Sequence, residues 1–109
     1  MKISDVCQKI ELKQMNQVNG DNEIEGVYIG DLLSFVMGNG KEGALWLTVQ
    51  RHMNVIAVAE LNDFAGIIFV EDVEPDADTI TQATKLDIPL FVSPLDAYAL
   101  TKELAQVGL

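Results

Sequence analysis

Cysteine, histidine and cationic side chains are scarce in this sequence of 109 residues. The only cysteine, Cys7, has no second cysteine for an internal disulfide or a zinc-binding pair, which favours a reducing, cytoplasmic location. Seven lysines and arginines face seventeen aspartates and glutamates, and the net charge of −10 disfavours binding to nucleic acid or anionic membranes. No stretch resembles a signal peptide or approaches the roughly 20 apolar residues of a membrane span.

The overall composition is that of an ordinary globular protein. Apolar residues make up 49% of the chain and charged residues 22%, which is too apolar for a disordered segment. The length suits one hydrophobic core, and no internal repeat, low-complexity tract or linker divides it. We therefore expect a single domain over residues 1–109.

Short strand-like runs alternate with helical runs along most of the chain. Such alternation implies right-handed crossovers and a mostly parallel sheet, so we predict a small α/β sandwich with helices flanking the sheet. The run 32–37 is predicted to form a helix with a broad apolar face. Strands are predicted at 11–15, 24–30, 44–49, 65–71 and 88–93, and helices at 4–10, 32–37, 55–61, 75–86 and 94–107.

Several helix ends are predicted from the preferences of cap residues. Ser4, Asn54 and Ser93 are expected to cap the first, third and last helices with their side-chain oxygens. Asp96 would then complete a capping box, and Gly108 would end the last helix. On the first helix, the spacing of apolar residues places Cys7 on the buried face.

Two motifs invite a functional interpretation that their context does not support. The segment "GNGKEG", 38–43, matches the glycine spacing of a dinucleotide-binding turn, but a helix precedes it and a strand follows it, the reverse of what pyrophosphate binding needs. We interpret Gly38 and Gly40 as helix stop and loop. The acidic run 71–78 matches no calcium-binding loop, and acids there stabilise a helix N-terminus. We predict no metal site and no cofactor.

The carboxyl ends of the predicted parallel strands are the expected place for a ligand, because helix N-termini offer unpaired N–H groups there. The only histidine, His52, lies in the most polar of these segments, "TVQRHMN". As a general base it would need an orienting carboxylate and a nucleophile, and sequence alone shows neither, so we predict no catalytic role. The candidate ligand-binding residues are Tyr28, Asp31, Thr48, Gln50, His52, Asn54, Glu71 and Ser93.

Two extended motifs, G-x-Y-x-x-D-L-L-S-x-V-M from Gly26 and W-x-T-x-Q-x-H-x-N-x-x-A-V-A from Trp46, resemble the DRTGG domain. This family is related to the N-terminal domain of HPr kinase/phosphorylase, and the similarity runs through residues 1–109. The segment that should carry the name-giving motif reads "EIEGV" and keeps only Gly26. The resemblance implies an α/β fold, no catalytic machinery and a regulatory role beside other domains, such as CBS domains in regulated pyrophosphatases. No phosphate-binding G-x-x-x-x-G-K-[ST] is present, so kinase activity does not carry over.

Three functions are compatible with these patterns. The first is a regulatory module that senses an adenine nucleotide or another small phosphorylated ligand at the strand ends. The second is an interaction domain that forms a homodimer, with the apolar run 65–71 as a candidate edge, or that docks on an enzyme subunit. The third is an enzyme that uses His52 with Gln50 and Asp31 as helpers, and we expect this one least.

Overall fold

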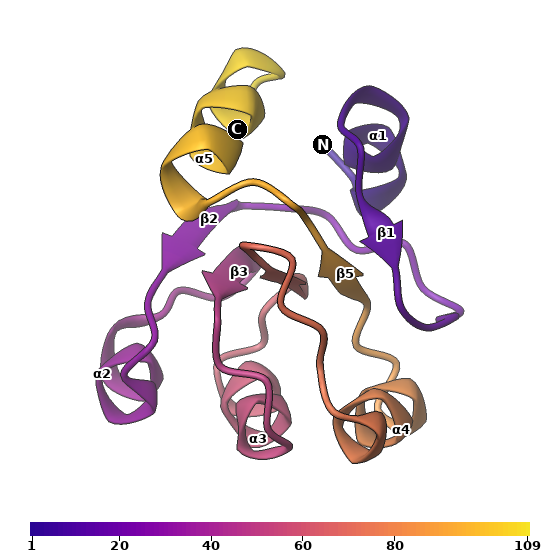
Figure 1. The fold of residues 1–109 in the computed structure, drawn as a ribbon, viewed down its shortest axis with the longest axis vertical. Coiled ribbons are helices and arrows are strands. Elements are labelled where there is room, and N and C mark those ends of the chain that lie inside the picture. Colours follow the sequence, from indigo (N-terminus) through magenta and orange to yellow (C-terminus); the bar gives the residue numbers. More distant parts are fainter.

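One five-stranded sheet organises the molecule, in the strand order β1-β5-β4-β3-β2. The computed structural model describes all residues 1–109 (Figure 1). Its strands are β1 (Lys13–Gln14), β2 (Gly26–Ile29), β3 (Ala44–Thr48), β4 (Gly66–Phe69) and β5 (Leu90–Val92). Its helices are α1 (Ile3–Lys9), α2 (Leu33–Asn39), α3 (Asn54–Leu61), α4 (Ala77–Lys85) and α5 (Ala97–Gln106).

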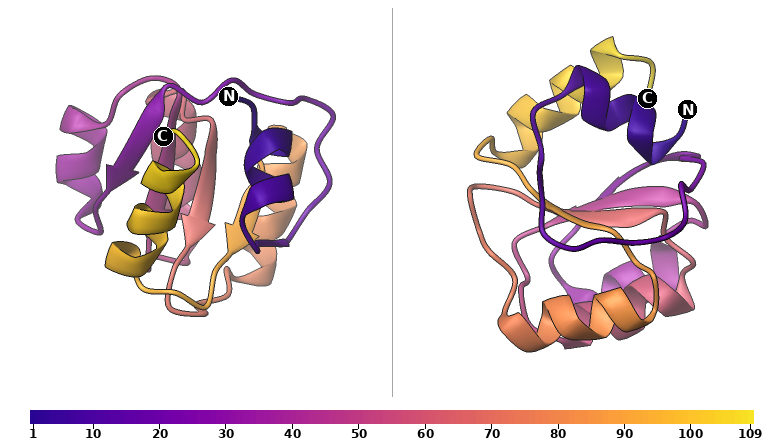
Figure 2. Two further views of the ribbon diagram at one scale, coloured as in Figure 1. Left: turned by 90° about the horizontal axis from the view of Figure 1, so that it is seen from above. Right: turned by 90° about the vertical axis from the view of Figure 1, so that its right-hand side faces the viewer.

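The sheet is parallel from β2 to β5, and only the short β1 runs antiparallel, beside β5. Helices α2, α3 and α4 cover one face, and α1 and α5 cover the other (Figures 1 and 2). The predicted α/β sandwich is therefore confirmed. The run 65–71 is not an edge: β4 lies between β3 and β5 with every residue buried, so it has no free surface for a dimer.

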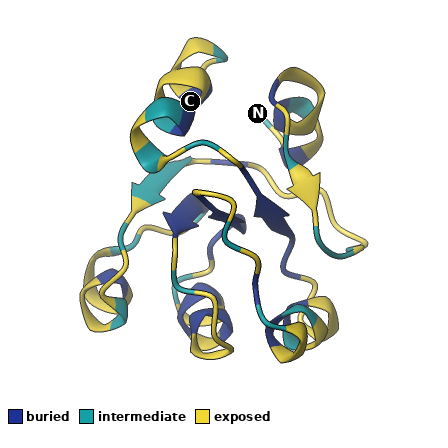
Figure 3. Ribbon diagram, in the orientation of Figure 1, coloured by how far each residue is buried: buried dark blue, intermediate teal, exposed yellow.

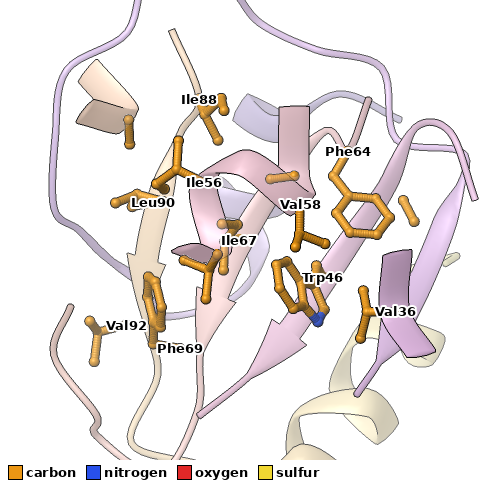
Figure 4. Packing of buried hydrophobic residues seen from close by; sticks show 14 residues of the cluster. Val36, Trp46, Ile56, Val58, Phe64, Ile67, Phe69, Ile88, Leu90 and Val92 are labelled. Atoms are coloured by element: carbon orange, nitrogen blue, oxygen red, sulfur yellow. The ribbon is translucent and has the colours of Figure 1, made fainter. Parts of the chain in front are cut away.

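Each face of the sheet has its own hydrophobic core, because side chains alternate between the two faces along a strand. Trp46 and Phe69 lie in the core beneath α2, α3 and α4, as expected for large apolar side chains on central strands (Figure 4). Leu47 and Phe91 belong to the core beneath α1 and α5. In Figure 3 the buried residues concentrate in the middle strands and on the inward sides of the helices. None of the helices has the length and apolar character needed to cross a bilayer.

The first helix differs from its prediction in two respects. It begins at Ile3, so Ser4 lies inside the helix and does not cap it. Its hydroxyl and N–H instead donate to the Asp21 carboxylate, and these bonds lower the pKa of that carboxyl. Cys7, predicted to be buried, is exposed, although partial burial of its thiol raises the pKa. The buried residues of α1 are Ile3 and Val6, and Cys7 lies at the margin of the face that they form.

The predicted cap residues of the third and last helices were wrong. Asn54 is the first residue of α3, and no side chain caps that helix. Asp96, not Ser93, caps α5 by accepting the Ala99 N–H at 2.8 Å, because α5 begins only after Asp96. Gly108 does follow the end of α5, with a positive φ of 113° that suits glycine.

Helix α2 does not bury a broad apolar face. Val36 is its only buried residue, and Leu32 and Phe35 expose 69% and 59% of their surface. The helix lies over the edge of the sheet, where β2 has a neighbour on one side only, so there is too little surface to cover all its apolar side chains. The predicted helix is present, but most of its broad apolar face is exposed rather than buried.

The structure explains Gly40 of "GNGKEG" but not Gly38, and the helix stop is Gly40 rather than Gly38 as interpreted from the sequence. Gly38 lies within α2, and a side chain there would meet nothing within 4 Å. Gly40 ends α2 with an ordinary φ of −64°, but an added Cβ would press on the Phe64 ring and lie 2.9 Å from the Val36 carbonyl oxygen. Gly40 is thus required by close approach, not by backbone conformation.

Gly38→Ala and Gly40→Ala should therefore have opposite effects on stability. Alanine at 38 should raise the free energy of unfolding by up to about 1 kcal/mol, because alanine is the better helix former. Alanine at 40 should lower it by about 1–3 kcal/mol, because the Phe64 ring must move. Urea unfolding of both variants measures these changes. An unfolding midpoint of Gly40→Ala equal to that of the wild type would show that the contact at Gly40 is unimportant.

Candidate functional site

The carboxyl ends of β2 and β3 are tied together by side chains that the sequence picked out. The Asp31 carboxylate accepts hydrogen bonds from the Thr48 hydroxyl at 2.8 Å and from the Val49 N–H at 2.9 Å. The Gln50 N–H donates to the Thr48 oxygen at 3.1 Å, and the Gln50 amide donates to the Asp31 carbonyl at 2.9 Å. Asp31, Thr48 and Gln50 thus lie together as predicted and form hydrogen bonds with one another, while Oδ2 of Asp31 and Oε1 of Gln50 accept none within the chain.

His52 belongs to a separate cluster. Its Nδ1 lies 2.6 Å from Oδ2 of Asp76, and the Arg51 Nε lies 3.4 Å from Oδ1 of the same carboxylate. The Arg51 carbonyl accepts the Asp76 N–H at 3.1 Å and the Thr79 hydroxyl at 2.9 Å. Sequence reasoning missed Asp76, although the start of the helix after the neighbouring parallel strand is where such a partner belongs.

The other predicted residues lie apart from these clusters. Tyr28 is half-buried on the face of the sheet that α2 covers and stacks on Phe64 with ring centroids 6.3 Å apart. Ser93 is fully buried, and its hydroxyl accepts the Leu95 N–H at 3.2 Å. Asn54 and Glu71 are exposed, and neither side chain makes a hydrogen bond within the chain. The eight candidates therefore do not form one site.

Backbone contacts rather than side chains join the segments after β4 and β5. The Glu71 N–H donates to the Leu95 carbonyl at 2.8 Å, and the Asp72 N–H donates to the Ser93 carbonyl at 2.9 Å. Both acids have positive φ, 57° and 61°, which turns the chain sharply after the strand. Glu74 then accepts a hydrogen bond from Lys13 of β1 at 2.9 Å, which raises the pKa of that lysine.

The largest hollow in the surface lies at the opposite ends of the strands. It has a volume of about 570 Å³ and its lining includes four carboxylates, those of Glu23, Glu25, Glu42 and Asp63. Sequence reasoning missed it because these acids come from three separate loops. No three histidine, cysteine or acidic side chains lie close enough together to hold a metal ion.

An apolar corner flanks the end of β2. We use this name for Ile29, Leu32, Phe35 and Val49, all of which are exposed. The Phe35 N–H donates to the Leu32 carbonyl, so these two side chains belong to the same turn. The Asp31 bond to the Val49 N–H brings Val49 beside that turn. The apolar corner was not predicted, because Leu32 and Phe35 were placed on an apolar helix face and Ile29 and Val49 in separate strands.

Thr48→Val tests whether the strand ends are held by these bonds. The substitution keeps the shape of a fully buried side chain but removes the hydroxyl that contacts Asp31 and Gln50. The free energy of unfolding should fall by about 1–3 kcal/mol, because two polar groups lose their partner. Thr48→Ser keeps the hydroxyl and serves as the control. Equal urea midpoints for the valine variant and the wild type would contradict this role.

Comparison with known proteins shows the fold and no more. No family model matches the sequence, and no curated protein matches it. Among solved structures, the chain is similar to the CBS and DRTGG domains of the regulatory region of Clostridium perfringens pyrophosphatase, complexed with the activator diadenosine tetraphosphate. The TM-score is 0.70 at 13% identity, over 95% of this chain and 46% of the other, so this chain spans about half of that length. The chain therefore has an α/β fold like that found in this regulatory region.

Proposed function

We propose that the chain is a non-catalytic regulatory module that works through a protein-binding surface at the apolar corner, and that its partner there is a second copy. The observation that carries the proposal is the exposure of Leu32 and Phe35, 69% and 59%, beside an unpaired strand edge. Clustered exposed apolar side chains of this kind mark interaction surfaces. The regulatory part is supported by the similarity to a pyrophosphatase regulatory region.

The free edge of β2 is suited to another strand. β2 pairs with β3 on one side only, and its residues Gly26–Ile29 include no charged side chain or proline. Natural proteins protect such edges with charges or cover them, because unpaired N–H and C=O groups recruit a further strand. Two identical edges related by a two-fold axis pair antiparallel, which satisfies the same groups on both copies.

The apolar corner extends such a contact to both faces of the sheet. Ile29 follows Val27 on the face that α1 and α5 cover, because side chains alternate along the strand. Phe35 belongs to α2, which covers the other face, and Leu32 is the N-cap residue of that helix (Figure 1). A second copy at the edge would therefore meet apolar side chains above and below the strands.

The net charge of −10 opposes association of two copies. Glu25 and Asp31 flank β2, so antiparallel pairing brings acids of the two copies near one another. Salt screens such repulsion over about 10 Å at 0.1 M. The dimer should therefore become tighter as the salt concentration rises, which is the reverse of an assembly held by ion pairs.

Ile29→Lys should convert the dimer into a monomer. A lysine at an edge strand prevents a second strand from pairing, and it lowers the net negative charge, so increased repulsion cannot explain the loss. Leu61→Lys is the control, since Leu61 is 67% exposed at the end of α3, away from the apolar corner. Sedimentation equilibrium at micromolar to millimolar concentrations measures both. A wild-type chain that stays monomeric throughout would refute the homodimer.

Sensing of an adenine nucleotide is the second candidate function, because the similar regulatory region was crystallised with a nucleotide activator. At the strand ends this function would depend on Arg51, whose side chain is 56% exposed. Arg51 already contacts the Asp76 carboxylate, and the net charge of −10 disfavours a polyphosphate with three or more negative charges. For this reason the protein-binding surface is the first candidate.

A thermal-shift series with AMP, ATP and diadenosine tetraphosphate tests this second function. A ligand at about 100 times its Kd stabilises a protein by about 2.7 kcal/mol, which amounts to several degrees in a chain of this size. Arg51→Ala should abolish the shift if the nucleotide binds at the strand ends, and Lys102→Ala on α5 should retain it. No shift with any of the three at millimolar concentration would reject nucleotide sensing.

A further inference from the structure

His52 is held in a way that leaves one ring nitrogen free. Its Nδ1 contacts the Asp76 carboxylate at 2.6 Å, and Nε2 has no partner within the chain. A carboxylate only accepts hydrogen bonds, so the Nδ1 atom carries the proton and Nε2 keeps its lone pair when the ring is neutral. The side chain is 67% exposed, so a molecule from solvent can reach it.

The backbone around His52 is fixed from two sides. The His52 carbonyl accepts the Val55 N–H at 3.1 Å at the start of α3. The preceding carbonyl, that of Arg51, accepts from the Asp76 N–H and the Thr79 hydroxyl at the start of α4. These bonds hold the backbone of His52 next to the start of α4, so that the imidazole lies within reach of the Asp76 carboxylate.

Arg51 adds a cation next to this pair. Its Nε lies 3.4 Å from Oδ1 of Asp76, and the remaining N–H groups of the guanidinium donate to nothing in the chain. A planar guanidinium with free donors matches the oxygens of a phosphoryl group. Arg51 is therefore the cation that would offset the charge of a phosphoryl group on His52.

We propose that Nε2 of His52 is a phosphoryl-acceptor site that takes its phosphoryl group from a small donor with a good leaving group, of the phosphoramidate or acyl phosphate class. The Nε2 lone pair attacks phosphorus and forms an N–P bond, while the bond to the leaving group breaks and its electron pair departs with that group. With phosphoramidate, ammonia leaves. The proton on Nδ1 stays in its bond to Asp76, which stabilises the positive charge that develops on the ring.

Phosphorylation of His52 goes beyond the proposed function and does not depend on it. A phosphoryl group would add about two negative charges to the strand ends. Neither the edge of β2 nor the apolar corner is part of the cluster, so a monomeric chain can carry the site equally well.

Incubation of the full chain with phosphoramidate tests the proposal. Mass spectrometry counts the phosphoryl groups, and 31P NMR distinguishes attachment at Nε2 from attachment at Nδ1. One group should appear, at Nε2, and none in His52→Ala. Asp76→Asn should react roughly tenfold more slowly, the low end of what a carboxylate contributes to a histidine that it orients. Asp78→Asn removes an equal charge from the same helix turn and should react like the wild type.

Asp76→Asn is expected to fold, because the Asp76 side chain makes no cap bond and asparagine is equally good at that position. Circular dichroism checks this. A peptide with the sequence "TVQRHMN" gives the reaction rate of the same histidine in an unfolded chain. The proposal is overturned if Asp76→Asn reacts at the wild-type rate, if the group is attached at Nδ1, or if the intact chain reacts no faster than the peptide.

Discussion

The carboxylate of Asp31 joins the ends of two neighbouring strands, and the surface on that side of the molecule depends on this contact. It accepts from the Thr48 hydroxyl and from the Val49 N–H, so β2 and β3 end at the same level. Asp31 is a good cap residue placed just before α2, yet α2 has no side-chain cap, because the carboxylate faces β3 instead. Leu32 consequently takes the N-cap position of α2, at the surface.

This arrangement places a hydrogen-bonded polar surface beside an exposed apolar one. Gln50 completes the contacts around Asp31 and Thr48, while Oδ2 of Asp31 and Oε1 of Gln50 accept no hydrogen bond within the chain. The apolar corner, in contrast, has nothing covering it within the chain. The proposed regulatory role needs a surface that another molecule can bind, and the apolar corner is better suited to that purpose than the polar strand ends.

Much of the fold was predictable because it follows from short-range patterns. The alternation of strand and helix runs led to the parallel sheet, and the burial of Trp46 and Phe69 followed from their place on apolar strands. The caps were harder, since Ser93 and Asp96 are both good cap residues and only the path of the chain decides between them. An apolar helix face indicates burial, but it does not show whether the covering surface belongs to the same molecule, as Phe35 illustrates.

The candidate site was predicted only in part, for a related reason. Parallel topology brings Asp31 and Thr48 together, and this much was foreseen. Pairing of His52 with Asp76 depends on how the loop after β3 meets the start of α4, which no local pattern encodes.

Hydrogen exchange of individual amides, followed by NMR on the ligand-free chain, tests most directly whether Asp31 closes the strand ends. Val49 is exposed and lies just beyond β3, so its amide should exchange rapidly unless Asp31 holds it. We predict slow exchange for the Val49 amide and rapid exchange of it in Asp31→Ala, whereas the Gln50 amide, which donates to Thr48, should change less. Rapid exchange of the Val49 amide in the wild type would show that Asp31 does not hold the strand ends together, and would contradict this role of Asp31.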